Sequence, residues 1–195
     1  EVCRGAHIED AVTLKTGFRT VLAAPDGFYL NGEKLKLVGL DRHQSYPYAG
    51  YALPERVQAA DADILRNYLH VNTVRTSHYL QSEGFLSRCD EVGLLVFSEI
   101  PGWGYIGGEK FKETSHQDIR DMIITQYNHP SIFIWSIRIN ESADDDEFYL
   151  KSNEIAHSLD KSRPTTGVRC IKNSHLLEDV YGFNDFIHMT REVKH

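Results

Sequence analysis

The stretch that decides the fold is "SIFIWSIRINES", residues 131–142. Its apolar run is interrupted only by Ser136 and Arg138, and it ends abruptly at Asn140 and Glu141. A run that is apolar throughout is typical of a strand buried on both faces, as in a parallel sheet. An amide beside a carboxylate at its end raises the question of what this strand delivers to the edge of the sheet.

Outward from this stretch, apolar runs alternate with helical patterns along the chain. Strands are expected at residues 36–40, 71–76, 94–98, 131–138, 164–168 and 179–183, and helices at 53–69, 82–93, 115–130 and 144–160, with one helical turn at 173–178. This order favours a parallel sheet covered by helices, either an open doubly wound sheet or a barrel. No glycine-rich nucleotide motif follows a strand, which removes the main support for the doubly wound sheet. The predicted fold class is therefore α/β, a (β/α)8 TIM barrel that is incomplete, with about six of eight strands.

Local signals place several boundaries. Residues 12–22 are expected to form a strand, and a hairpin is expected over 28–40 because its arms are joined through Asn31-Gly32. Ser82 and Gly93 are suited to begin and end the second helix. The third helix is expected to begin at a capping box formed by Ser115 and Asp118 and to stop at Pro130.

Composition excludes several classes of function. The chain has 195 residues and a net charge of −7, and no basic cluster, so nucleic acid and anionic membranes are not expected as partners. No apolar run approaches the ~20 residues of a membrane span. The three cysteines are far apart, without a metal-binding or redox spacing, and are expected to be free thiols of a cytoplasmic protein.

Polar side chains follow the end of every predicted strand, where parallel barrels carry their chemistry. They are Asp41, Arg42 and His43; Arg75, His78 and Tyr79; Glu99 and Trp103; Asn140 and Glu141; Arg169; and Asn184 and Asp185. Carboxylates, an amide, imidazoles and an exposed aromatic ring suit a carbohydrate, because hydroxyls need directed hydrogen bonds and the sugar ring needs a flat apolar surface. Glycoside hydrolysis in particular needs two carboxylates beside the scissile bond.

Each of these residues also has a purely structural interpretation. Glu141 and Asn140 could stabilise the start of the following helix, and His78 could be a histidine satisfied at the sheet edge. Arg75 and Arg42 could be salt-bridge partners of carboxylates rather than ligand contacts. Trp135, in the middle of its strand, is expected to fill the barrel, and the acidic run 144–146 to be a solvated helix start.

The chain resembles the catalytic barrel of glycoside hydrolase family 2, the β-galactosidase and β-glucuronidase group. The matching segments are "GFR" (17–19), "FYLNGEKLKLVGLDRHQS" (28–45), "DADILRNYLHVNTVRTSHY" (61–79), "CDEVGLLVFSEIPGW" (89–103), "YNHPSIFIWSIRINES" (127–142) and "DKSRPTTGVR" (160–169). The resemblance implies that residues 1–24 are the tail of a preceding immunoglobulin-like β-sandwich domain. Residues 25–195 would then be the first three quarters of the barrel domain.

The resemblance also implies roles for site residues. Glu141 matches the family's general acid/base, Asn140 the residue that contacts the sugar 2-hydroxyl, and His78 a residue lining the sugar subsite. His43, Arg75, Glu99 and Trp103 are expected to complete the substrate-binding site. The implied reaction is retaining hydrolysis of a terminal β-glycosidic bond, most simply a β-galactoside, without a cofactor; glucuronide and mannoside are alternatives.

Three features depart from patterns found in the family. One extra residue separates Trp135 from Asn140, so that either a bulge absorbs it or Glu141 turns to the wrong face. The family's nucleophilic glutamate follows a seventh strand, for which this chain shows no counterpart, and the piece is expected to be inactive alone. The metal-binding Glu-x-His that some family members carry after the third strand is replaced by "IPGW" (100–103), so no metal is expected.

Two rival hypotheses stay open at this stage. One is a carbohydrate-binding barrel without catalysis, and the other is an enzyme that uses Glu99 and Glu141 as its working pair. The open edge left by an incomplete barrel would also suit pairing with another copy in a homo-oligomer.

Overall fold

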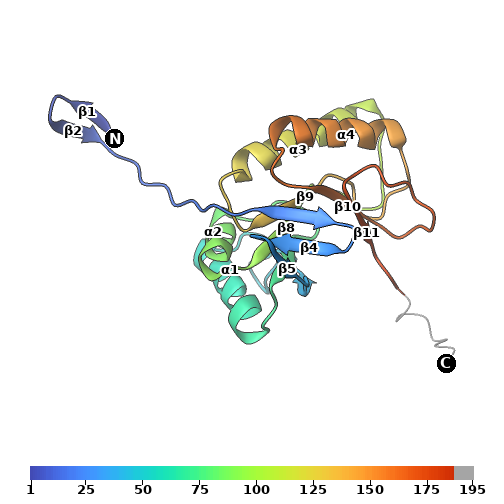
Figure 1. The fold of residues 1–195 in the computed structure, drawn as a ribbon, viewed down its shortest axis with the longest axis horizontal. Helices are drawn as coiled ribbons and strands as arrows, with labels where there is room; N and C mark the ends of the chain where they lie inside the picture. Colours follow the sequence, from blue (N-terminus) through green and yellow to red (C-terminus); the bar gives the residue numbers. More distant parts are fainter. Residues whose placement is uncertain (187–195) are drawn as a thin grey trace.

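The computed structural model describes residues 1–186, and its centre is a six-stranded parallel sheet (Figure 1). The strands lie in the order β11-β10-β9-β8-β7-β6, so that neighbours in sequence are neighbours in the sheet. Their bounds are β6 Gly39–Asp41, β7 Thr73–Arg75, β8 Leu95–Glu99, β9 Ile132–Ser136, β10 Thr165–Arg169 and β11 Val180–Phe183. Every residue of β7, β9 and β10 is buried, as expected of strands covered on both faces. The six predicted strands are thus confirmed, and within residues 1–186 the barrel stays open between β6 and β11.

Helices connect the strands from β6 to β10. They are α1 Glu55–Asp63, continued by the π-helix η1 Ile64–Tyr68, then α2 Glu83–Val92, α3 Glu109–Gln126 and α4 Asp146–Leu159. α1 packs on α2 and α3 packs on α4, which places the two pairs over different parts of the sheet (Figure 1). In the described part of the chain no helix is both long and apolar enough to cross a membrane.

Two helix boundaries follow the predicted signals and one does not. The side chain of Ser82 caps the backbone N–H of Phe85, and Gly93 ends α2 in the left-handed conformation. α3, however, begins six residues before the predicted capping box, directly after Gly108, and Ser115 is buried inside it. The prediction was wrong because the glycine pair at 107–108 already sets the helix start.

The prediction of a helical turn at 173–178 is also wrong, because this segment is irregular. Its polar groups are used in tertiary contacts instead. The hydroxyl of Ser174 donates to Asp144, and the carboxylate of Glu178 accepts a hydrogen bond from Arg169. Such contacts compete with local helical hydrogen bonds.

The N-terminal region differs from the predicted strand at 12–22. β1 Val2–Arg4 and β2 His7–Asp10 form a hairpin that projects away from the sheet (Figure 1). Residues 11–20 are not a strand, because they have no partner strand within the described chain. Within the predicted strand at 12–22, only the last two residues belong to a strand, β3 Val21–Ala24. β3, β4 Gly27–Leu30 and β5 Glu33–Leu35 form an antiparallel sheet whose predicted turn at Asn31-Gly32 is confirmed.

Two apolar clusters explain which end of the barrel is accessible. The larger fills the space between sheet and helices, and the smaller packs Leu95, Phe133 and Ile134 against β3–β5. The smaller cluster involves early residues of β8 and β9, so the antiparallel sheet closes the N-terminal end of the barrel. The C-terminal ends of the strands are thereby left accessible, which is where barrels carry their sites.

Trp135 was expected to fill the inside of the barrel. It is instead fully buried in the larger cluster, between the sheet and the helices. Its indole N–H donates to Asp160 at 2.9 Å, and Arg163 donates to the same carboxylate at 2.6 Å. Burial alone would raise the pKa of Asp160, but hydrogen bonds from Arg163, Ser162 and Trp135 outweigh it and lower the pKa below 3.8.

We expect Asp160→Asn to lower the free energy of unfolding of the whole protein by about 3 kcal/mol at neutral pH, because it leaves a buried guanidinium without its counter-ion. A lowered folded-state pKa stabilises above the unfolded pKa and is lost as pH falls through the folded value, so the difference between variant and parent should shrink only below about pH 4. Urea unfolding measures both effects. The exposed carboxylate of Glu154 provides the control, as Glu154→Gln should change nothing measurable; equal stability of Asp160→Asn and the parent would contradict the assignment.

Candidate active site

A bulge after β9 aims Glu141 at the C-terminal end of the barrel. The backbone N–H groups of Trp135 and Ile137 donate to Pro164 and Thr166, two residues apart on each strand, but the next such bond joins the N–H of Glu141 to Val168. Residues 137–141 therefore advance four positions while the neighbouring segment advances two. The bulge absorbs the extra length in "SIRIN", and Glu141 itself has a left-handed backbone with φ of 56°.

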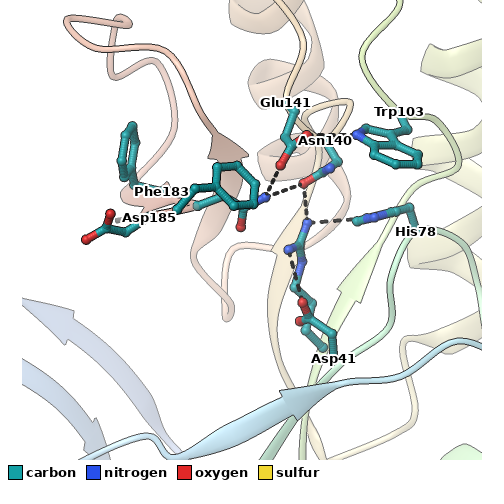
Figure 2. Close-up of a pocket in the computed structure, with 10 residues that line it drawn as sticks. Asp41, His78, Trp103, Asn140, Glu141, Phe183 and Asp185 are labelled. Atoms are coloured by element: carbon teal, nitrogen blue, oxygen red, sulfur yellow. Dashed lines mark hydrogen bonds and ion pairs between the residues drawn. The ribbon is translucent and has the colours of Figure 1, made fainter. Parts of the chain in front are cut away.

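Both carboxylate oxygens of Glu141 accept hydrogen bonds from residues that follow other strands of the sheet (Figure 2). The indole N–H of Trp103, which follows β8, lies 2.9 Å from Oε2. The side-chain amide of Asn184, which follows β11, lies 2.6 Å from Oε1. The carboxylate is thus fixed in direction and remains partly exposed.

Arg75 links the side chains that lie beside this carboxylate through hydrogen bonds. Its guanidinium donates to Glu99 at 2.7 Å. It also donates to the side-chain oxygen of Asn140 at 2.6 Å (Figure 2). Glu99 is fully buried, and its second oxygen lies 2.6 Å from the imidazole Nδ1 of His78. A buried arginine–carboxylate pair with further hydrogen bonds holds both Asn140 and His78 in fixed positions.

These groups surround a pocket of about 310 Å³ at the C-terminal ends of β6 to β9 and β11. Its lining residues are Asp41, Arg75, His78, Trp103, Asn140, Glu141, Phe183, Asn184, Asp185 and Phe186. Five of the seven site residues predicted from the sequence therefore line one pocket. Within residues 1–186, no cluster of three or more histidine, cysteine or acidic side chains is arranged to hold a metal ion.

The other two predicted site residues lie next to the pocket rather than in its wall. His43 is exposed, and its ring centroid lies 5.6 Å from that of His78. Glu99 lies behind Arg75 and His78, with its carboxylate occupied by both. Glu99 therefore holds Arg75 and His78 in place and does not itself face the pocket.

Arg42 and Arg169 follow strands but turn away from the pocket. Arg42 is buried beneath α1 and α2, where it binds Asp61 and lies 4.1 Å from the ring of Phe85. Arg169 is fully buried and binds Glu178. The salt-bridge interpretation thus holds for Arg42, whereas Arg75 combines a salt bridge with a place in the pocket wall.

The pocket is also lined by residues that were not among the seven predicted site residues, namely Asp41, Phe183, Asn184, Asp185 and Phe186. Asp41 and the pair 184–185 do carry the signal used for the others, namely a polar side chain directly after a buried strand. The two phenylalanines carry no such signal, because an aromatic residue near a strand end is equally suited to a core.

Comparison with known proteins defines the class to which this fold belongs. The family model described as "Glycosyl hydrolases family 2, TIM barrel domain" matches residues 23–194, nearly the whole chain. The six parallel strands and their helices are therefore part of a TIM-barrel domain. The chain belongs to glycosyl hydrolase family 2.

Individual relatives agree with this assignment. The chain is 62% identical over 182 residues to a β-galactosidase of Thermoanaerobacterium thermosulfurigenes and 44% identical over 171 residues to a β-galactosidase of Rhizobium meliloti, covering 93% and 83% of this chain. It superposes on the crystal structure of an FMN-binding β-glucuronidase from Faecalibacterium prausnitzii with a TM-score of 0.82 at 32% identity, covering 87% of this chain and 28% of that one. The chain spans about a quarter of the length of the curated relatives, 25% and 22% respectively.

Proposed function

We propose that the whole protein is a retaining β-galactosidase and that Glu141 is its general acid/base. The observation that carries the proposal is the placement of the Glu141 carboxylate, which is partly exposed in the pocket while Trp103 and Asn184 fix both of its oxygens. A group that must give and take a proton at one atom needs such a fixed direction. The relative that is 62% identical over most of this chain bears the name β-galactosidase, which supports the choice of substrate class.

In the proposed reaction, a nucleophilic carboxylate attacks the anomeric carbon while the bond to the leaving oxygen breaks. Glu141 donates its proton to that oxygen, and the leaving alcohol departs. Glu141 then removes a proton from water as the water attacks the anomeric carbon, which releases the sugar and restores both carboxyl groups. The two carboxyl groups of such an enzyme lie about 5 Å apart.

We propose that the nucleophile lies outside the described residues. Among the carboxylates near the pocket, Glu99 is fully buried and bound by Arg75 and His78, which denies it access to an anomeric carbon. This argues against the Glu99–Glu141 pair as the working machinery. Asn140 and His78, held by Arg75 and Glu99, are proposed to bind sugar hydroxyls.

The charge of the pocket favours a neutral sugar over a uronate. Arg75 is the one arginine or lysine among the lining residues that the structure describes, and its guanidinium is already paired with Glu99 and Asn140. Asp41 adds a carboxylate to the same wall. A uronate carboxylate would meet repulsion here without a free cation to offset it.

We expect the whole protein to hydrolyse a nitrophenyl β-galactoside with a kcat/KM at least ~10²-fold above those for the matching β-glucuronide and β-mannoside, because polar groups built for one sugar reject its analogues strongly. Steady-state rates with the three glycosides measure this directly. A preference for the glucuronide would refute the galactoside assignment while leaving the role of Glu141 intact. Binding of galactosides without turnover of any glycoside would favour the non-catalytic carbohydrate-binding alternative.

Three further assignments belong to the proposal. Residues 1–24 would end a preceding β-sandwich domain, which is supported by the exposure of every residue of β1 and β2, although β3 pairs with β4 across that boundary. For residues 1–195 produced alone, a homo-oligomer is proposed, because the sheet edges at β6 and β11 are open within the described residues. A cytoplasmic location is proposed from the three free cysteines.

A further inference from the structure

Arg138 is a fully buried arginine in the bulge that delivers Glu141. It lies three residues before Glu141, away from the pocket wall, and has no direct contact with the carboxylate. Burying a guanidinium costs several kcal/mol unless counter-ions and hydrogen bonds compensate. Its retention inside an otherwise apolar strand end calls for a physical account.

The guanidinium of Arg138 holds the backbone that follows Glu141. Its Nη2 lies 3.4 Å from the carbonyl oxygen of Ser142, 3.3 Å from that of Ala143 and 2.5 Å from the carboxylate of Asp144. The guanidinium also lies 4.4 Å from the ring of Tyr149, whose hydroxyl is 2.6 Å from that of Ser142. Arg138 on one side of Glu141 is thereby tied to the three residues on its other side.

Charges around Arg138 are balanced. Asp144 lies on one side, and Glu178, which also binds Arg169, lies 3.9 Å from its Nη1 on the other. Burial alone would raise the pKa of Asp144, but hydrogen bonds from Ser174, Arg138 and the backbone of His175 lower it to about 2. The carboxylate of Asp144 is therefore charged at every pH at which an enzyme of this kind works.

The neighbouring strand leaves room for this arginine. Gly167 of β10 faces Arg138, and a Cβ atom at that position would lie 2.2 Å from the Cβ of Arg138. Any side chain at Gly167 would displace the bulge. The glycine and the arginine thus form a matched pair on adjacent strands.

We propose that Arg138 is a positioning residue, which closes the bulge around the left-handed turn at Glu141 and so holds the acid/base carboxylate in its working direction. The proposal rests on the proposed role of Glu141. Without Arg138, the backbone at 142–144 loses its anchor, and the carboxylate keeps only its contacts to Trp103 and Asn184. Misplacement of a catalytic group by ~1 Å costs about 10²-fold in rate.

The test compares Arg138→Lys with the parent in the whole protein, using two substrates that differ in their need for an acid. A disaccharide β-galactoside requires protonation of its leaving oxygen, whereas a dinitrophenyl β-galactoside does not. The quantity compared is kcat/KM for the disaccharide divided by kcat/KM for the dinitrophenyl substrate. This ratio does not depend on how much of a preparation is folded. We expect Arg138→Lys to lower kcat/KM for the disaccharide by ~10- to 100-fold and that for the dinitrophenyl substrate by less than ~5-fold.

Arg163→Lys is the matched control. Arg163 is likewise buried and paired with a carboxylate, but it lies before β10, at the opposite end of the sheet from Glu141. It should lower thermal stability and leave the ratio unchanged. Asp144→Asn, which removes the counter-ion of Arg138 and retains a side chain of the same size, should lower the ratio in the same direction and covers the case in which Arg138→Lys does not fold.

A double-mutant comparison separates this proposal from the one on which it rests. If Arg138 acts through Glu141, adding Arg138→Lys to Glu141→Gln should change the ratio by less than ~3-fold. A ratio unchanged by Arg138→Lys and Asp144→Asn, or an undiminished effect of Arg138→Lys in the Glu141→Gln background, would overturn the positioning role alone. A ratio unchanged by Glu141→Gln itself would overturn the acid/base assignment and this inference with it.

Discussion

Glu141→Gln is expected to lower kcat/KM for a disaccharide β-galactoside by ~10²- to 10⁴-fold, the range that a general acid supplies. The glutamine has nearly the same size, and its one side-chain oxygen can accept the hydrogen bond of either Trp103 or Asn184, so the pocket should keep its overall shape. It cannot donate a carboxylic proton, and the leaving oxygen would depart as an unstabilised anion. For a dinitrophenyl β-galactoside, whose leaving group needs no proton, kcat/KM should fall by less than ~10-fold.

The exposed Glu113 on α3 supplies the matched control, because Glu113→Gln removes the same charge far from the pocket. It should leave both substrates unaffected. Equal losses on the disaccharide and the dinitrophenyl substrate in Glu141→Gln would show that the residue does not act as a proton donor. In that case its hydrogen bonds to Trp103 and Asn184 would have only a structural role.

Residues 1–195 produced alone are expected to show no measurable turnover of a nitrophenyl β-galactoside, while the whole protein turns it over. Among the described carboxylates at the pocket, we assign none as nucleophile, and acid assistance alone supplies only ~10²–10⁴-fold. Retaining hydrolysis needs the covalent step as well. Release of nitrophenol at matched molar concentrations gives the comparison, and circular dichroism shows whether the shorter chain is folded.

Robust turnover by residues 1–195 would contradict the assignment of the nucleophile outside the described chain. The carboxylates at or behind the pocket would then need to be tested one at a time, beginning with Glu99 and Asp41. A folded but inactive chain that still binds galactose would agree with the account, because Asn140 and His78 are already held in place by Arg75 and Glu99.

The barrel strands could be predicted from the sequence because burial on both faces leaves a direct trace. Apart from the charged residue that ends β7, β8 and β10, the segments that form β7 to β10 are apolar or small in composition, and they are separated by helical periodicity. Most of the site followed from one rule, that polar side chains after such strands meet at one end of a barrel. Arg75, His78, Trp103, Asn140 and Glu141 all obeyed it.

Features that depend on tertiary partners could not be predicted in this way. The extended segment 11–20 has strand-like residues in part, but a strand forms only where another strand pairs with it. The irregular segment at 173–178 gives up its helical hydrogen bonds for contacts to Arg169 and Asp144. Local sequence holds no information about those distant partners.

The bulge after β9 could be predicted only in part from the sequence. The sequence indicates surplus length between Trp135 and Asn140, and two outcomes for Glu141 fit that count equally well. Hydrogen bonds from Ile137 and Glu141 to β10 decide between them. The burial of Arg138 was equally beyond reach, because an arginine within an apolar run gives no sign of whether its head lies in water or in a paired interior site.

The most direct measurement for the central claim is a rapid-mixing experiment with Glu141→Gln and a dinitrophenyl β-galactoside. Formation of the glycosyl-enzyme needs the nucleophile but no acid, whereas its hydrolysis needs Glu141 as a base. We therefore expect a full burst of dinitrophenol, close to one equivalent per active site, followed by a slow steady state. A variant that loses the burst as completely as it loses turnover of the disaccharide would show that Glu141 is not the general acid/base.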